Sequence, residues 1–202
     1  MCSWCWGFKP VWSKLQKTLP PNIQVRYLLG GLAEDSDVPM PLPLQSTIQK
    51  TWHRIQNEIS GISFNFDFWT NNIPCRSTYP ACRAVIAARK QNSSMHIKMI
   101  DKIQQAYYLK ALNPSDITVL MQCAKELDLN SDQFAYDLSS TETQNILIQE
   151  INLSRELGVQ GFPGLVLNFS DKDYFIDVNY NNENSMLTNI NRILSSIELN
   201  PH

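Results

Sequence analysis

The sequence predicts an α/β fold in which a long helical block interrupts a smaller mixed unit. Three observations lead to this prediction. Periodic segments follow in the order helix, strand, helices, strand, strand, helix. A Cys-x-x-Cys pair, Cys2 and Cys5, stands at the beginning of the first helix. A turn with the sequence Gly161-Phe162-Pro163-Gly164 runs directly into the apolar strand near the end of the chain.

Length and charge exclude several classes of protein. The chain has 202 residues, enough for one domain with a sizeable core or for one domain with a large insertion. Charged residues make up 18% and the net charge is −2, so neither nucleic acid nor an anionic membrane is an expected partner. Apolar stretches such as 62–69 and 161–167 are too short to span a bilayer. We expect neutral or protein-like partners.

The first 45 residues predict a helix, a strand and a loop. Apolar residues from Trp6 to Leu15 have helical spacing, and Pro20-Pro21 ends that helix. Residues 22–29 alternate between polar and apolar and then become apolar, as a half-buried strand does when it enters a core. The Pro-, Asp- and Ser-rich stretch 33–45 predicts a loop and a boundary.

The rest of the chain divides into a helical block and a mixed end. From about 46 to 157 the spacing is helical throughout, with a cap predicted at Asn113 to Asp116 and another at Asn130. Strands at 165–168 and 174–178 flank a turn at 170–173, and a last helix covers 184–199. We therefore predict one domain from residues 1–45 with 158–202, and a helical insertion domain at 46–157.

The position of the cysteine pair at the start of a helix favours a reactive thiolate. Unpaired N–H groups and the positive end of the helix dipole stabilise a thiolate at the first turn of a helix. Two cysteines separated by two residues can close a disulfide or release it. Structural zinc sites use the same spacing, so the pair alone is weak evidence for redox chemistry. The distant Gly-Phe-Pro turn strengthens the redox interpretation.

Four stretches of the chain follow in the order 1–8, 28–32, 77–84 and 158–163. Together they resemble the DsbA-like family, a thioredoxin-like fold with a large helical insertion, and in particular its FrnE-like, protein-disulfide-isomerase branch. The resemblance covers essentially the whole chain and implies a thiol-disulfide oxidoreductase, a disulfide isomerase or reductase acting on protein thiols and disulfides. It implies no metal and no cofactor beyond the Cys2–Cys5 disulfide, with glutathione as a possible electron donor.

The resemblance also implies the roles of individual residues. Cys2 would be the exposed nucleophile, Cys5 the buried resolving thiol, and Pro163 a cis proline facing Cys2. Trp4, Phe162 and Gly161 are the expected substrate contacts, whereas Trp6 is expected in the core. Because Ser3 and Trp4 supply no cation between the cysteines, we expect isomerase or reductase activity rather than strong oxidation.

One feature departs from the family. Thioredoxin-like proteins have a strand directly before the redox helix, whereas only Met1 precedes Cys2 here. We therefore expect that the first strand is missing from this sequence and that the natural product begins upstream of Met1. That strand would lie between 23–29 and 165–168. As written the chain carries no secretory signal and predicts a cytoplasmic protein, although an upstream segment could carry one.

The sequence is also compatible with other functions and with other roles for its cysteines. Related glutathione-dependent transferases and isomerases of the kappa and hydroxychromene-carboxylate type share the architecture but replace the dithiol by a single Ser or Cys. A zinc- or peptide-binding module without enzymatic activity is a further alternative. Cys75 and Cys82 are a second redox pair, half of a zinc site with Cys2 and Cys5, or two unrelated thiols, the option we favour from their wide spacing. Cys123 is expected in the core.

Overall fold

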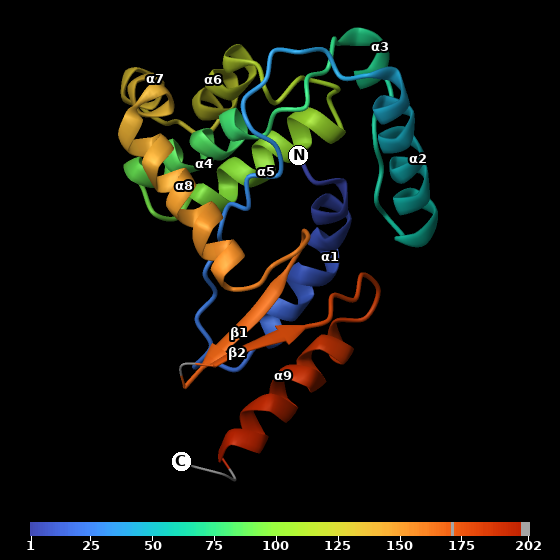
Figure 1. Cartoon of the computed structure of the whole chain (residues 1–202), viewed down its shortest axis with the longest axis vertical. Coiled ribbons are helices and arrows are strands. Elements are labelled where there is room, and N and C mark those ends of the chain that lie inside the picture. The colour runs from blue at the N-terminus through green and yellow to red at the C-terminus, as the bar shows by residue number, and fades with distance from the viewer. Residues whose placement is uncertain (171, 199–202) are drawn as a thin grey trace. The chain divides into compact units, whose positions relative to one another are not determined.

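The computed structural model describes residues 1–170 and 172–198 (Figure 1). The chain divides into two compact units. The hairpin unit contains Cys2–Tyr27 and the chain from Ser154 onward, and the helical unit contains Met1 and Leu28–Leu153. In this division residues 28–45 lie with the helices. The domain bounds predicted from the sequence stay a prediction.

The hairpin unit packs two helices against a two-stranded antiparallel sheet. Strand β1 (Leu165–Phe169) pairs with β2 (Lys172–Ile176), and Leu165 lies opposite Ile176. Since strand side chains alternate between faces, one face carries apolar residues and the other carries Phe175, which is 57% exposed. The apolar face contributes to a core that it shares with helices α1 (Ser3–Thr18) and α9 (Glu183–Glu198). The buried members of that core are Phe8, Val11, Leu15, Ile176, Met186, Ile190 and Ile193.

The predicted hairpin is confirmed, but β1 runs one residue beyond the predicted 165–168, and β2 begins and ends two residues before the predicted 174–178. The strands are joined at Ser170, whose φ of 50° is left-handed, so the turn is shorter than the predicted 170–173. Asp171 of that turn and Leu199 at the end of the predicted last helix lie outside the described residues. The side chain of Asn182 caps α9, because its oxygen accepts from the N–H groups of Asn184 at 3.0 Å and Ser185 at 3.3 Å.

The helical unit is built from helices α2 to α8. Helix α4 (Tyr79–Gln91) packs against α5 (Met95–Tyr108), α6 (Ile117–Lys125) and α7 (Ser131–Ser139). Figure 1 shows α4 and α5 side by side. Helix α2 (Leu42–Glu58) carries the fully buried Trp52, and the remaining helices are α3 (Phe68–Asn71) and α8 (Thr141–Glu156). None of the helices within 1–170 and 172–198 has the length and apolar character that a bilayer crossing needs.

Small residues explain how α4 comes to lie at the centre of its neighbours. Ala84, Ala87 and Ala88 are fully buried in the main core of the helical unit, together with Met99 of α5 and Phe134 of α7. An alanine adds little thickness to a helix surface, so several helices can approach α4 closely. The expected position of Cys123 is confirmed, since it is buried in the same core.

The predicted strand at 22–29 is wrong for this structure. Within the described part of the chain β1 and β2 form a two-stranded sheet, and no ladder joins 23–27 to β1. Ile23 packs into the core of the hairpin unit without strand pairing. Further along, the backbone N–H of Leu29 donates to the carboxylate of Glu150 at 2.9 Å. Alternating polarity identifies a half-buried segment, but a strand also needs a partner for its backbone.

Three local predictions can be compared with the structure directly. Helix α2 begins at Leu42, inside the predicted loop 33–45, because Pro43 is tolerated in a first helical turn. Helix α6 is preceded by Asp116, and Asn113 instead accepts from the N–H of Ser115 at 3.1 Å, so the predicted cap at Asn113 is wrong. The predicted cap of α7 is confirmed, since Asn130 accepts from the N–H of Gln133 at 2.8 Å.

Candidate active site

Cys2 occupies the N-cap position of α1. Its backbone is extended, with φ −96° and ψ 113°, and its sulfur accepts a hydrogen bond from the N–H of Cys5 at 3.2 Å. The N–H of Cys5 belongs to the first turn of the helix, where such groups have no intrahelical acceptor. A sulfur at this position replaces the oxygen that usually caps a helix, and a negative charge on it is stabilised by the end of the helix.

The turn before β1 brings the second half of the site to the same sulfur. The peptide bond between Phe162 and Pro163 is cis, as the family resemblance implies. The Cys2 thiol donates to the carbonyl oxygen of Phe162 at 3.3 Å, across 160 positions in sequence. A side chain at Gly164 would force this turn to shift, because an added Cβ would lie 2.7 Å from a methyl carbon of Val159 and 3.2 Å from the carbonyl oxygen of Gly161. Gly161, by contrast, is exposed and has open space around it.

The pKa values of the two thiols are shifted in opposite directions. The hydrogen bond with Cys5 lowers the pKa of Cys2 against the opposing effect of burial, and backbone N–H groups lower it further. The pKa of Cys5 lies well above its usual range, first because of the hydrogen bond with Cys2, then because of burial and the charge on Cys2. Cys2 is therefore the more acidic thiol of the pair, and Cys5 holds its proton more tightly.

Aromatic side chains line one face of α1 beside the cysteines. Trp4 packs against Tyr180, with ring centroids 5.0 Å apart, and Phe8 packs against the same tyrosine at 5.9 Å. Trp4 remains half-buried, whereas Trp6 is only 8% exposed, which confirms its expected place in the core. Tyr180 lies in a loop after β2, and no pattern in the sequence identified it as a site residue.

The structure thus brings some of the site residues predicted from the sequence together. Cys2, Cys5 and Phe162 meet at the first turn of α1, Pro163 follows Phe162 in the chain, and Trp4 lies between the two cysteines in sequence. Phe162 is half-buried. Their catalytic and substrate-binding roles stay predictions.

The remaining cysteines differ from this pair. Cys82 packs against the apolar cluster of Tyr79, Ile86, Leu147 and Ile151, and burial raises its pKa to about 11. The backbone of Cys75 forms an isolated antiparallel β-bridge with Pro39. The structure records both as free thiols. Across the described ranges no three His, Cys, Asp or Glu side chains are grouped as a metal site would need.

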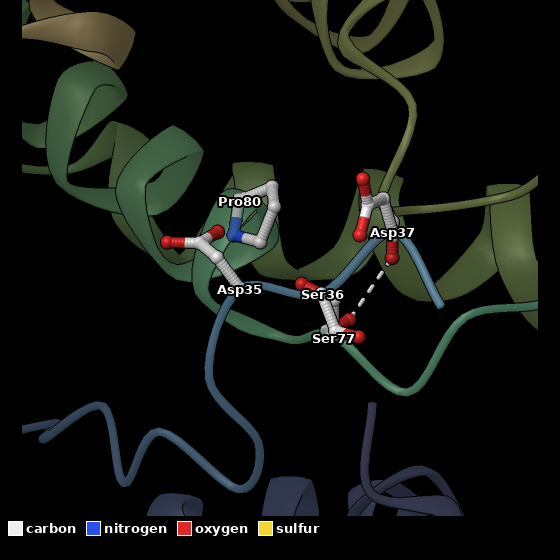
Figure 2. A pocket seen from close by; sticks show the side chains of 6 residues that line it. Asp35, Ser36, Asp37, Ser77 and Pro80 are labelled. Atoms are coloured by element: carbon white, nitrogen blue, oxygen red, sulfur yellow. Dashed lines mark hydrogen bonds between the residues drawn. The ribbon is translucent and has the colours of Figure 1, made fainter. Parts of the chain in front are cut away.

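The helical unit also contains an open cavity of about 350 Å³ (Figure 2). Its lining consists of Asp35, Ser36, Asp37, Ser77, Pro80 and Ser115. The Ser115 hydroxyl donates to the carbonyl of Ser77 at 2.9 Å, and Arg83 holds Asp35 in a two-pronged ion pair at 2.7 and 2.8 Å. The lining offers hydroxyls and carboxylates but neither cysteine of the dithiol.

A family model described as thioredoxin matches residues 1–189. Among solved structures, a candidate protein disulfide isomerase from Nitrosomonas europaea is similar over 97% of this chain and 94% of that chain, with a TM-score of 0.84 and 24% identity. The cytosolic disulfide reductase DsbM from Pseudomonas aeruginosa is similar over 96% and 95%, with a TM-score of 0.77 and 20% identity. At these identities the likeness concerns the fold.

Curated relatives carry a different description. The ClpXP adapter protein SpxH of Halalkalibacterium halodurans is 24% identical over 175 residues, which cover 85% of this chain and 56% of that protein. A Bacillus cereus protein of the same name is 22% identical over 175 residues, covering 86% and 58%. The chain spans about half the length of the curated relatives it matches.

Proposed function

The chain belongs to the thioredoxin family, and on that premise we propose that it is a thiol-disulfide oxidoreductase working through Cys2 and Cys5. One observation supports this most directly. The Cys2 sulfur caps α1 and accepts from the N–H of Cys5 at 3.2 Å. This environment favours the thiolate, which is the nucleophile of disulfide exchange.

The proposed reaction has two exchange steps. The Cys2 thiolate attacks one sulfur of a substrate disulfide, the substrate S–S bond breaks, and the other substrate sulfur leaves as a thiolate. Cys5 then loses its proton to water or to that leaving thiolate and attacks the Cys2 sulfur. The mixed disulfide breaks, the second substrate sulfur leaves, and Cys2–Cys5 is oxidised while the substrate gains two electrons.

The coupling of the two thiols sets the order of these steps. The raised pKa of Cys5 depends first on its hydrogen bond with Cys2 and also on the charge of Cys2. Once the Cys2 sulfur is bonded to substrate it carries no charge, so both of these influences are removed and only burial still disfavours the Cys5 thiolate. Cys5 is therefore held in reserve until the mixed disulfide exists.

We further propose reduction or isomerisation of protein disulfides as the direction, with a glutathione-type thiol as electron donor. Hydrogen bonds and the charge of the N-terminus lower the pKa of Cys2, and no Lys, Arg or His side chain is among the causes. The less a thiolate is stabilised, the less oxidising is the disulfide that it forms. The name of the Pseudomonas neighbour, a cytosolic disulfide reductase, agrees with this direction and with a cytoplasmic setting.

Substrate would bind beside the turn that carries Pro163. A proline has no N–H, so the residue that follows the Phe162 carbonyl offers no competing donor to the Cys2 sulfur. Gly161 is exposed and leaves room for an extended peptide, and the half-buried Trp4 and Phe162 offer apolar contacts. We assign substrate contact to these three residues.

Insulin reduction with glutathione tests the proposal. Wild type should accelerate precipitation of the insulin B chain, Cys2→Ser should fall to the rate of glutathione alone, and Cys5→Ser should lose most turnover. Cys75→Ser is the matched control, because it removes a half-buried thiol outside the pair, and it should retain wild-type activity. Full activity of folded Cys2→Ser would refute the proposed chemistry.

The curated relatives favour a second candidate, an adapter that presents proteins to the ClpXP protease. Such a role needs binding but no thiol exchange. The Cys2→Ser, Cys5→Ser double variant separates the two candidates. If it speeds ClpXP degradation of a labelled cysteine-containing client as well as wild type does, while wild type fails to reduce insulin, the adapter function replaces the oxidoreductase.

A further inference from the structure

The end of α8 fixes the backbone of Val159. Gly158 is left-handed, with a φ of 74°, and its N–H donates to the carbonyl of Arg155 at 2.8 Å. The N–H of Val159 donates to the carbonyl of Ser154 at 3.0 Å, which completes the closing motif that a glycine after a helix permits. The ring of Phe175 covers Gly158, since an added Cβ there would lie 3.0 Å from a ring carbon. Val159 therefore enters the next turn from a fixed position.

The side chain of Val159 packs against the far end of that turn. An added Cβ at Gly164 would lie 2.7 Å and 3.6 Å from its two methyl carbons, so the methyl groups occupy the space of a side chain at this position. The same Cβ would lie 3.2 Å from the carbonyl oxygen of Gly161, so the two ends of the turn approach each other closely. The φ of Gly164 is not positive, and space rather than backbone conformation therefore favours glycine there. Because the turn is compact, a shift of Gly164 relative to Val159 also moves Phe162.

The Phe162 carbonyl acts on the Cys2 sulfur in the opposite sense to the helix. The N–H of Cys5 donates to this sulfur at 3.2 Å and stabilises a negative charge on it. The Cys2 thiol donates to the Phe162 oxygen at 3.3 Å, a bond that exists only while the sulfur carries its proton. The carbonyl therefore favours the thiol, whereas the N–H favours the thiolate. Among the described residues, the titratable or charged groups that interact with this sulfur are the Cys5 thiol, the N-terminal amine and the Tyr180 phenol.

We propose that Val159 is a positioning residue of the dithiol, whose methyl groups hold the Phe162 carbonyl on the Cys2 thiol and thereby keep a larger share of the nucleophile protonated. This inference rests on the proposed function, because the protonation of Cys2 matters for activity only if Cys2 attacks the substrate. A thiolate that is less stabilised is more nucleophilic once it forms. Val159 thus lowers the share of thiolate and raises the reactivity of each thiolate.

The dependence of Cys2 alkylation on pH tests this role without any substrate. Iodoacetamide reacts with the reduced protein, and fragment-ion mass spectrometry assigns the modification to Cys2. In Val159→Ala the carbonyl is no longer held, so the midpoint of the curve of rate against pH should move to lower pH. Well below the midpoint the rate should rise about twofold, as expected for the loss of one weak S–H hydrogen bond, while the alkaline plateau should not rise. Val159→Ile keeps both branches at Cβ and should behave as wild type does.

Three further variants separate this contact from a general loosening. Val166→Ala, the matched control, removes the same methyl groups from a half-buried valine of β1 and should leave the curve unchanged. Gly164→Ala pushes the turn away from Val159 and should also move the midpoint to lower pH. In the double variant Val159→Ala, Gly164→Ala the new methyl group enters the space that the valine leaves. Its midpoint should therefore return part of the way to that of wild type, so the two substitutions are not additive.

Three results would overturn the inference: a folded Val159→Ala protein with the wild-type curve, an equal gain in rate at every pH, or a shift that Val166→Ala shares. The first would show that the valine does not hold the carbonyl. The second would mean that the substitution only opened access to the sulfur, and the third that any loosening of the hairpin unit has this effect. If circular dichroism shows that Val159→Ala is unfolded, Gly164→Ala is judged by the same criteria. Because alkylation needs no turnover, this inference can fail while insulin reduction by Cys2 stands.

Discussion

Replacing Glu150 by alanine should destabilise the helical unit by about 2–4 kcal/mol. One carboxylate oxygen of Glu150 accepts from the guanidinium of Arg89 at 2.5 Å, and the other accepts from the N–H of Leu29 at 2.9 Å. The Glu150 side chain is only 8% exposed, so it is an acceptor that water cannot readily replace.

The expected loss of stability follows from the interaction that each partner of Glu150 loses. The Leu29 N–H is partly buried, and leaving such a donor without an acceptor costs about 1–3 kcal/mol. The Arg89 side chain is 30% exposed, so its loss is closer to a screened ion pair, about 1 kcal/mol, than to a fully buried one. The two contributions together give the stated range.

Urea unfolding followed by circular dichroism measures this effect as a shift of the transition midpoint at unchanged slope. Glu156→Ala is the control, because Glu156 is an exposed residue of the same helix, and a surface substitution usually stays within about 0.5 kcal/mol. A Glu150→Ala protein as stable as this control would refute the reasoning, since the carboxylate would then hold neither partner.

Three further predictions concern titration and capping. Burial raises the pKa of Cys82 from 9.0 to about 11, so between pH 9 and 11 the unfolded state binds fewer protons than the folded state. The free energy of unfolding should therefore fall by about 2–3 kcal/mol as pH rises through this range. In urea titrations Cys82→Ala should remove this part of the alkaline loss of stability. Cys2 should be alkylated at a pH where an ordinary thiol is mostly protonated, whereas Cys5 should stay slow, and equal pH profiles would contradict the hydrogen-bonded pair. Asn130→Ala should lower stability by about 1 kcal/mol because α7 loses its cap, and thermal unfolding would reveal no change if the cap were unimportant.

Local chemistry was predictable from sequence wherever the partners are close in the chain. The N-terminal N–H groups of a helix are a fixed property of its first turn, so the place of Cys2 and the cap at Asn130 follow from a few neighbouring residues. The approach of the Phe162 carbonyl to Cys2 spans 160 positions, and no periodicity predicts such a contact. Only the resemblance of four stretches to a known family led us to expect this turn near Cys2, with Pro163 as the residue that faces it.

The misses have a common physical origin. The alternation at 22–29 indicates which side chains are half-buried, yet strand formation depends on a backbone partner that a local pattern does not specify. The N–H of Leu29 finds that partner in the Glu150 side chain. Tyr180 was missed because its loop has no period, although the asparagines at 179 and 182 are typical of turns and helix caps and marked an ordered loop. A strand upstream of Met1 stays a prediction.

Trapping a mixed disulfide on the Cys5→Ser variant tests the proposed chemistry most directly. Without a resolving thiol the first exchange step should proceed and the second should stop, so a disulfide-containing peptide should become covalently attached. Mass spectrometry should place one peptide on Cys2, removable by dithiothreitol, and none on Cys75 or Cys82. Attachment to one of those thiols instead, or no adduct on the folded variant, would contradict Cys2 as the nucleophile.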